Sequence, residues 1–336
     1  MSSSRRGGGD ALSPLRIMEL AWGFQTSRIL LTACELELFT ALGNDGATSA
    51  QIARMLHTDE RATDRLMNAL CAVGLLAKKE GLFSNTALTS RFLIKGTSSY
   101  VAAVEHVANL WDTWSTLTDA VRAGTKVAER PSETDPKKRR KAFIAAMHWF
   151  AGMRARDVIA LLDLSNVWRV LDVGGGSGAY AMEFVRAKDG VTACVFDLPN
   201  IIPLTQSYIA DAGLTDRIDT ATGDFVTDDL GSGFDLAFLS AVVHSNSPEE
   251  NESLIRKSAD AVNPGGQVVI QDFIMDGDRT SPPFGALFAL NMLVNTEAGD
   301  TYTERQVRAW MEHAGLVGIE RQDTVFGTTL ITARKP

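Results

Sequence analysis

The chain has 336 residues, 45% of them apolar and 22% charged, a balance typical of a soluble globular protein with about two domains. Its formal net charge of −8 argues against a protein that binds nucleic acid over its whole surface. It contains no run of about 18 apolar residues, so we expect no membrane-spanning helix. The cysteines Cys34, Cys71 and Cys194 form no CxxC pair, and we therefore expect no disulfide framework, no metal site and a reducing cytoplasm.

The first half of the chain is rich in helical patterns. Residues 1–12 are charged with no apolar stretch behind them, which indicates a disordered tail rather than a secretory signal. Residues 13–123 are expected to form a mainly helical domain of the winged-helix type, because two short helices are followed by a hairpin. Its expected elements are a long helix over residues 13–42, helices over 48–56 and 60–73, and strands at 75–77 and 82–84.

A connecting segment is expected over residues 124–165. Residues 124–141 are polar, contain Pro131 and Pro136, and end in the basic run Lys137–Lys141, which we interpret as a solvated face of a linker. A helix over residues 143–162 then leads into the second half.

From residue 166 to residue 336, short β-rich runs alternate with helical ones. This alternation predicts an α/β domain of the Rossmann type, with a mostly parallel, seven-stranded sheet covered by helices. The last two strands are expected to form a hairpin that runs antiparallel to the rest. The expected strands are residues 169–173, 192–196, 218–222, 236–240, 267–271, 318–322 and 328–333, and the expected helices are 180–187, 201–212, 248–262, 284–294 and 303–314.

The strongest motif is the glycine-rich stretch VLDVGGGSG, residues 170–178, where a predicted strand ends and a predicted helix begins. Glycines there let the backbone turn sharply and lie close to a ligand. The loop has no lysine, so it is not a P-loop. Asp197, about twenty residues further on, can accept from ribose hydroxyls, and Asp224 with Phe225 can meet an adenine ring. The pattern fits a nucleoside with an amino-acid tail, with a nicotinamide or flavin as the alternative.

These motifs resemble those of the S-adenosylmethionine-dependent O-methyltransferases that act on small molecules, which include the plant caffeate-type and hydroxyindole O-methyltransferases. The resemblance rests on VLDVGGGSG, FDLP at residues 196–199, GDF at 223–225 and a histidine after the fourth strand of the sheet. It covers nearly the whole chain. It implies an N-terminal dimerisation domain, a homodimer, S-adenosylmethionine as cofactor and a small-molecule acceptor, aromatic or polyketide-like, that is methylated on a hydroxyl.

His244 follows the fourth strand of the predicted sheet, where ligand sites of open α/β sheets gather. Transfer of an activated methyl group needs a strong nucleophile, and a histidine near neutral pH can create one by taking a proton from a hydroxyl. The resemblance matches His244 to the family's general base and Asp272 to a carboxylate that orients it. A second orienting glutamate of the family is replaced here by Thr301, so Asp272 acts alone, or Asp300 or Glu297 substitutes.

The resemblance also assigns further site residues by position. Phe143 and Met147 match a substrate-lining F-x-x-x-M, and Met292 with Thr296 match the acceptor-lining helix; His148 and Trp149 are weaker candidates. The residues expected to contact the cofactor are Gly174, Gly176, Asp197, Leu198, Asp224, Phe225 and Ser240.

Two other functions fit parts of the sequence. Thr301 leaves open a relative that methylates carbon or nitrogen, or one that binds the cofactor without methyl transfer. A winged helix also occurs in DNA-binding regulators, but residues 37–95 carry seven Lys or Arg against six Asp or Glu, which gives no basic stripe. We therefore expect no nucleic-acid partner.

Overall fold

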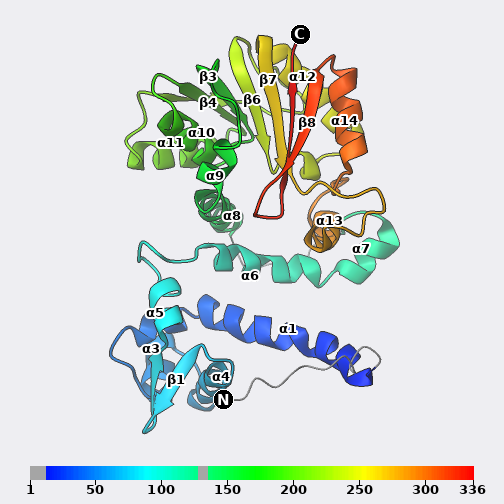
Figure 1. Cartoon of the computed structure of the whole chain (residues 1–336). Coiled ribbons are helices and arrows are strands. Elements are labelled where there is room, and N and C mark those ends of the chain that lie inside the picture. Colours follow the sequence, from blue (N-terminus) through cyan, green and yellow to red (C-terminus); the bar gives the residue numbers. More distant parts are fainter. Residues whose placement is uncertain (1–12, 128–134) are drawn as a thin grey trace, which may run out of the picture. The chain divides into compact units, whose positions relative to one another are not determined.

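The computed structural model describes residues 13–127 and 135–336 (Figure 1). The predicted tail, residues 1–12, lies outside the described residues. Contacts within the chain divide it into two compact units, Met1–Ala108 and Asn109–Pro336. This division falls inside α6 (Ala103–Trp114), before the boundary that we placed at residue 123.

The first unit begins with α1 (Pro14–Glu35) and α2 (Leu38–Leu42), so the prediction of one helix over residues 13–42 was wrong. Between them Glu37 adopts a left-handed conformation with φ of +55°. This turn redirects the chain so that the Leu38, Phe39 and Leu42 side chains of α2 enter the core of the unit. Burial of these apolar side chains stabilises the turn.

The helix–helix–hairpin order of the first unit is as expected. It consists of α3 (Ser49–Leu56), α4 (Glu60–Ala72), β1 (Leu76–Lys79) and β2 (Leu82–Asn85), followed by α5 (Ala87–Phe92). The Thr48 side chain accepts from the Gln51 backbone N–H, and the Gln51 side chain accepts in return, so a capping box starts α3. The antiparallel hairpin buries Phe83 against Met67 and Leu70 of α4.

The second unit starts with three helices after α6: α7 (Leu117–Ala123), α8 (Pro136–Gly152) and α9 (Ala155–Ile159). The basic run Lys137–Lys141 lies in the first turns of α8, so the prediction of a linker up to residue 141 was wrong. Asp135 caps the helix by accepting from the Lys137 backbone N–H, and Pro136 stands at its first position, where its missing N–H costs nothing. The helix expected over residues 143–162 is instead the end of α8 followed by α9.

The seven-stranded sheet has the order β5-β4-β3-β6-β7-β9-β8. All neighbouring pairs are parallel except β7 with β9 and β8 with β9. Only β9 therefore runs against the other strands, whereas we expected both strands of the hairpin to do so. The strands are β3 (Arg169–Val173), β4 (Thr192–Asp197), β5 (Ile218–Thr222), β6 (Phe234–Ser240), β7 (Val262–Asp272), β8 (Val317–Asp323) and β9 (Thr329–Arg334).

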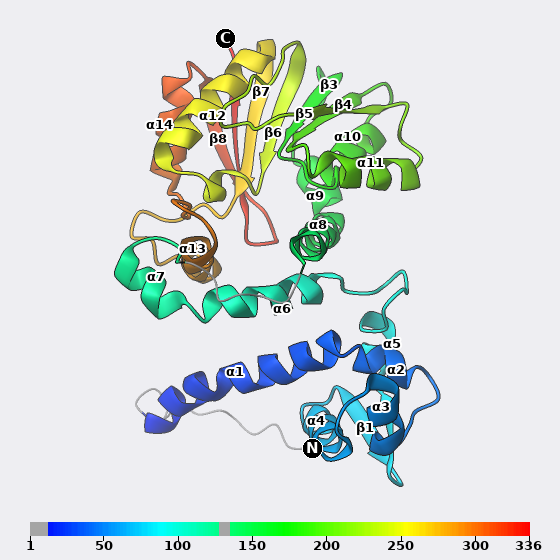
Figure 2. The ribbon, with the colours of Figure 1, turned by 180° about the vertical axis from the view of Figure 1, so that it is seen from behind.

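Helices cover both faces of this sheet (Figures 1 and 2). On one face α9, α10 (Ala179–Ala187) and α11 (Ile202–Asp211) pack on side chains such as Val170 and Phe238. On the other face α12 (Pro248–Ala261) and α14 (Glu304–His313) pack on Leu171 and Leu239. The alternation of side chains along each strand sends neighbouring residues to opposite faces, which is why the central strands are almost fully apolar.

The strand order reverses at β3, which lies between β4 and β6. In open α/β sheets, ligands bind outside the carboxyl ends of the strands at such a point. The carboxyl ends of β3, β4, β6 and β7 carry or precede the glycine loop, Asp197, His244 and Asp272 respectively. The topology therefore gathers the predicted cofactor and catalytic residues at one edge of the sheet.

Candidate active site

The glycine loop follows β3 with three residues in the left-handed region: Gly174, Gly176 and Gly178, with φ of +65°, +58° and +74°. Residues that carry a side chain rarely adopt this backbone conformation, so these positions require glycine. Gly175 is restricted differently, because a Cβ there would lie 2.6 Å from the Asp172 carboxyl group. The loop thus presents bare backbone at the edge of the sheet, which suits close approach of a ligand.

Asp197, the last residue of β4, bridges the loop to its own strand. Its Oδ2 accepts from the Gly176 backbone N–H at 2.8 Å, and its Oδ1 accepts from the Leu198 backbone N–H at 2.7 Å. Burial raises the pKa of this carboxyl, while the two backbone hydrogen bonds oppose the shift. Each oxygen keeps a further lone pair for a hydroxyl donor. The arrangement fits the ribose-binding acid that we expected, and the Leu198 side chain beside it is exposed.

Asp172 lies beneath the loop and is fully buried. Its Oδ2 accepts from the Ala181 backbone N–H at 3.2 Å, in the first turn of α10, where Gly178 provides no side-chain cap. Burial raises the pKa of this carboxyl to about 7, with a further contribution from the negative charge of Asp197. The acid in front of the glycines therefore supports the loop and helix from inside.

Asp224 and Phe225 follow β5 and close one side of the loop. A Cβ on Gly174 would lie 3.5 Å from Cε1 of Phe225 and 3.0 Å from a methyl group of Val242. The Phe225 ring thus lies against the glycine backbone. Asp224 accepts from the Val226 backbone N–H at 2.9 Å and is half-buried, so a carboxylate and an aromatic ring stand together beside the loop.

Two helices hold the other side of the loop. The Thr205 hydroxyl of α11 donates to the Gly176 carbonyl, and Nδ1 of His148 on α8 lies 2.9 Å from the hydroxyl of Ser177. The His148 ring stacks on Tyr208 of α11, with ring centres 4.3 Å apart. The sequence indicated His148 only as a weak substrate-lining candidate, and the structure makes it a contact of the loop.

Ser240 ends β6, and its hydroxyl donates to Oε1 of Gln271 at 2.8 Å. Ala241 comes next and has φ of +56°, although it is not a glycine. Its backbone N–H donates to the Gln271 carbonyl at 2.9 Å, which continues the pairing with β7. This turn sends the chain back so that Val242 reaches the glycine loop and His244 reaches β7.

His244 and Asp272 form a buried pair. Nδ1 of His244 lies 2.8 Å from Oδ1 of Asp272, and the carboxylate also accepts from the backbone N–H groups of His244 and Phe273. A carboxylate only accepts, so Nδ1 carries the proton of the neutral ring, and Nε2 keeps its lone pair. The structure thus brings together the two residues predicted as base and orienting acid.

The chain around His244 is fixed by further buried polar groups. Asn251 donates through Nδ2 to the Val243 carbonyl at 2.8 Å, and the Tyr302 hydroxyl donates to the Asn246 carbonyl. A Cβ on Gly299 would lie 2.4 Å from the His244 carbonyl oxygen, so the segment before α14 packs directly on this turn. These contacts hold the 3-10 turn Val243–Ser245 in place.

An aromatic cluster covers the imidazole. Phe288 of α13 (Pro283–Asn295) meets His244 edge to face, with ring centres 4.8 Å apart, and also packs on Phe273 and Phe284. Sequence reasoning missed Phe288. The signal was present, because Phe288 lies four residues before Met292 and therefore on the same face of the predicted helix.

The alternative orienting acids point elsewhere. Asp300 pairs with Arg279 at 2.7 Å, and Glu297 pairs with Lys126 at 3.0 Å. The hydroxyl of Thr301, in the place of the family's glutamate, donates to the Gly285 carbonyl at 3.3 Å and is buried. Of these candidate acids, Asp272 is therefore the carboxylate that contacts His244.

The four substrate-lining candidates fall on two helices. Phe143 and Met147 lie on α8, the first exposed and the second half-buried, next to the loop-contacting residue Ile144. Met292 is buried on α13, and Thr296 follows the end of that helix. The Thr296 hydroxyl accepts from the Gly299 backbone N–H at 2.9 Å, which places it beside the His244 turn.

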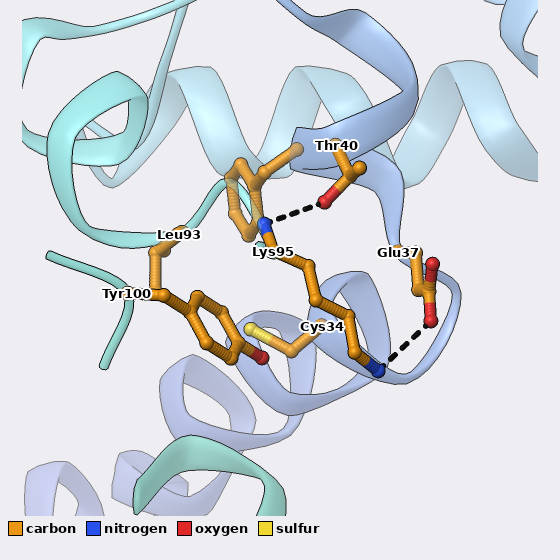
Figure 3. A pocket seen from close by; sticks show the side chains of 7 residues that line it. Cys34, Glu37, Thr40, Leu93, Lys95 and Tyr100 are labelled. Atoms are coloured by element: carbon orange, nitrogen blue, oxygen red, sulfur yellow. Dashed lines mark hydrogen bonds and ion pairs between the residues drawn. The ribbon is translucent and has the colours of Figure 1, made fainter. Parts of the chain in front are cut away.

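Three further findings concern other kinds of site. Within the described part of the chain, no group of three or more His, Cys, Asp or Glu side chains could hold a metal ion. In residues 13–127 and 135–336, no helix is both long and apolar enough to cross a membrane. A small hollow in the first unit, between Cys34, Lys95 and Tyr100, has a volume of about 10 Å³, room for about one water molecule (Figure 3).

Comparison with known proteins agrees with this geometry. Residues 114–317 match the family model of the O-methyltransferase domain, and residues 18–95 match that of the O-methyltransferase dimerisation domain. A Rossmann-type sheet with a glycine loop, an acid at the end of β4 and a buried His–Asp pair fits a transferase that binds a nucleoside cofactor. The chain belongs to the O-methyltransferase family, which uses S-adenosylmethionine as methyl donor.

Similar proteins extend over almost the whole chain. The 3-hydroxy-5-methyl-1-naphthoate 3-O-methyltransferase of Streptomyces sahachiroi is 35% identical, over 90% of this chain and 89% of its own length. The tetracenomycin polyketide synthesis 8-O-methyl transferase of Streptomyces glaucescens is 30% identical, over 98% of each chain. The solved structure of human N-acetylserotonin methyltransferase in complex with S-adenosylmethionine is 26% identical, with a TM-score of 0.84 over 97% of this chain and 99% of that chain.

Proposed function

We propose that this enzyme methylates a hydroxyl group of a small aromatic or polyketide-like metabolite, with His244 as the general base. The observation that carries the proposal is the buried His244–Asp272 pair at the carboxyl edge of the sheet, next to the glycine loop. The names of two relatives, one specifying a naphthoate and the other polyketide synthesis, support an aromatic or polyketide-like acceptor.

His244 removes the acceptor's hydroxyl proton through Nε2, the ring nitrogen that Asp272 leaves free. The proton that arrives on Nε2 makes the ring an imidazolium, and the Asp272 carboxylate at Nδ1 stabilises its positive charge. S-adenosylmethionine supplies a methyl group activated by its sulfonium. Phe288, which packs on Phe273, excludes water from one side of the imidazole and so strengthens these interactions in the site.

The proposed cofactor residues contact different parts of S-adenosylmethionine. Gly174 and Gly176 offer backbone without side chains, Asp197 accepts from the ribose hydroxyls, and Phe225 with Asp224 receives the adenine. Leu198 contacts the nucleoside through its exposed side chain, and Ser240 meets the methionine tail. The Asp197 and Asp224 carboxylates are acceptors for the hydroxyl and amine donors of an adenosine, which supports the assignment.

The acceptor residues lie on α8 and α13. Phe143 and Met147 form one wall, and Met292 and Thr296 form the other, near the His244 turn. Methionine adapts to irregular shapes and aromatic rings stack, so these side chains suit a flat apolar ring. Holding the hydroxyl in line with the methyl group supplies much of the remaining rate enhancement.

The enzyme acts as a homodimer through its first unit, which carries the dimerisation domain of the family. Helix α1 exposes large apolar side chains that a second copy would cover, and Leu20 is 68% exposed. A Leu20→Asp variant should shift the mass measured by light scattering from dimer to monomer. An unchanged dimer would contradict this interface.

A cytoplasmic location fits the chemistry of the cysteines. Cys34, Cys71 and Cys194 are all free thiols in the structure. Free thiols persist in a reducing compartment. Fractionation of the source cells, with the protein followed by an antibody, tests this location, and recovery outside the cytoplasm would contradict it.

Methyl transfer is tested directly with labelled S-adenosylmethionine and a panel of phenols, naphthols and polyketide phenols. Label should appear in at least one phenolic product, bound to oxygen. Tight cofactor binding with no transfer to any phenolic or enolic acceptor would contradict the proposal.

One observation favours a second candidate, a family member that methylates carbon or nitrogen or binds the cofactor without transfer. Thr301 replaces the family's second orienting carboxylate, and its hydroxyl is committed to Gly285. Product analysis by mass spectrometry and NMR distinguishes the two, because a methyl group on carbon or nitrogen would favour this candidate.

A further inference from the structure

Helix α8 has two neighbouring stripes of side chains with different surroundings. Ile144 and His148, four residues apart, face the glycine loop: a Cβ on Gly176 would lie 3.7 Å from Cδ1 of Ile144, and His148 contacts Ser177. Phe143 and Met147, also four residues apart, form the adjacent stripe, which we assigned to the acceptor. Residues four apart share a face of a helix, so each stripe is a continuous surface.

The contact between His148 and Ser177 is partly buried and held by the groups around it. Ser177 is only 2% exposed, and its hydroxyl lies 2.9 Å from Nδ1 of His148. The imidazole is held flat against Tyr208, with 24° between the rings. Burial, with a smaller effect of Arg186, lowers the pKa of His148, so the ring is neutral near pH 7. A buried hydroxyl with a satisfied partner is costly to disrupt.

Both ends of this contact belong to elements that the site uses. Ser177 follows Gly176, whose N–H is held by Asp197 and whose carbonyl is held by Thr205. His148 comes directly after Met147, which belongs to the acceptor stripe. A side-chain hydrogen bond therefore joins the cofactor loop to the helix that carries one acceptor wall.

We infer that His148 is a positioning residue: through Ser177 it locks α8 to the glycine loop, so that occupation of the loop by the cofactor orders the acceptor wall. The inference rests on the proposed cofactor loop. A ligand that rigidifies the loop reduces the freedom of α8 as well, and the acceptor then meets a wall that is already in place.

Hydrogen–deuterium exchange of the full chain, with and without S-adenosylhomocysteine as probe, tests the link without knowledge of the acceptor. In the wild type, the probe should slow exchange in residues 141–152 of α8 as well as in the loop and α10. In His148→Ala and Ser177→Ala, slowing in the loop should remain, but slowing in α8 should be lost.

The atom that makes the contact allows a sharper test. Asparagine places a polar atom near Nδ1 of a histidine, whereas glutamine places one near Nε2. His148→Asn should therefore keep the slowing of α8, and His148→Gln should lose it. His313, an exposed histidine at the end of α14, provides the matched control, and His313→Asn should behave as the wild type.

Binding of S-adenosylhomocysteine provides a second readout. Loss of one hydrogen bond should raise its Kd by roughly 2- to 10-fold in His148→Ala and in Ser177→Ala. The double variant should be no weaker than the single ones, because both remove the same contact. Two outcomes would overturn the inference and leave the proposed cofactor site standing. One is additive effects in the double variant, and the other is exchange in α8 of His148→Ala that the probe still slows as in the wild type.

The proposed cofactor site fails in a different way. If the probe binds to the wild type but does not slow exchange in the glycine loop, the loop is not the cofactor site, and the link falls with it. Circular dichroism and thermal melting of each variant establish that the fold is retained, and His148→Asn keeps the test valid where His148→Ala unfolds.

Discussion

A single carboxylate, that of Asp272, holds both the side chain and the backbone of His244. Nδ1 of His244 lies 2.8 Å from Oδ1 and 3.0 Å from Oδ2, and the His244 backbone N–H donates to Oδ2 at 3.3 Å. The imidazole has little freedom to rotate, because its ring and its main chain are anchored at the same group. The direction of Nε2 is therefore set before any acceptor binds.

Replacement of His244 should remove the base and leave the cofactor site intact. His244→Ala should lower kcat by on the order of 10²- to 10⁴-fold, while the Kd for S-adenosylhomocysteine stays within about twofold. Initial rates and calorimetric titration measure the two quantities. His313→Ala is a matched control, because His313 also pairs with a carboxylate, Glu252, at 2.8 Å but is exposed. A wild-type rate in His244→Ala would contradict the assignment of the base.

Replacement of Asp272 by asparagine should disturb the orientation of the base. The amide has one accepting oxygen for three donors: the Nδ1–H and N–H groups of His244 and the N–H of Phe273. We expect kcat to fall roughly 10- to 10³-fold and stability to fall by about 1–3 kcal/mol.

Thr301→Val is the control for the orienting role. It removes only the hydrogen bond to Gly285, so kcat should stay within about twofold, and stability should fall by about 1 kcal/mol. A large loss of kcat in this variant, with none in Asp272→Asn, would transfer the orienting role to Thr301.

Replacement of Asp197 should weaken cofactor binding rather than chemistry. Asp197→Asn loses the charge that strengthens hydrogen bonds from hydroxyl donors, so the Kd for S-adenosylmethionine should rise roughly 10- to 100-fold. At saturating cofactor, kcat should be nearly unchanged. Equilibrium titration provides the measurement, and Asp211→Asn, at the exposed end of α11, provides the control. Unaltered affinity in Asp197→Asn would remove this residue from the cofactor site.

Asp172 should make stability depend on pH. Its pKa is raised from 3.8 to about 7 in the folded chain, so the folded state binds a proton that the unfolded chain has lost. The contribution of this group to the free energy of unfolding is greatest below about pH 4 and is lost as the pH rises to about 7, a change of roughly a few kcal/mol. Asp172→Asn cannot ionise and still accepts from Ala181.

Urea denaturation at several pH values between about 4.5 and about 7.5 measures this effect. The variant should be increasingly more stable than the wild type as the pH rises across that range. A difference that does not change with pH would show that Asp172 keeps an ordinary pKa in the folded protein.

Local patterns predicted the elements that position the site. The glycines of residues 174–178 predicted the turn between β3 and α10, because left-handed backbone needs them there. The β-rich runs predicted all seven strands of the sheet, and the predicted topology placed Asp197 and His244 at the carboxyl ends of strands. The pairing of His244 with Asp272 was predicted from the resemblance to the family. The strands and the glycine turn needed only local sequence and the topology of a parallel sheet.

Features that depend on tertiary packing escaped prediction. The break at Glu37 arises because Leu38 and Phe39 must enter the core, which no helical pattern reveals. The basic run at the start of α8 was predicted to belong to a polar linker. The helix start that Asp135 and Pro136 form was not recognised. Contacts such as His148 with Ser177, or Phe288 with His244, join elements far apart in the chain.

The left-handed backbone of Ala241 limits which sequences can carry this site. Alanine has only a Cβ, which already makes φ near +56° sterically unfavourable. β-branched residues tolerate this conformation worst. In a saturation library scored for folded, active protein, position 241 should therefore accept glycine and asparagine but reject valine and isoleucine. The main-chain conformation thus limits which amino acids can occupy position 241, close to His244, although the side chain at that position has no part in the chemistry.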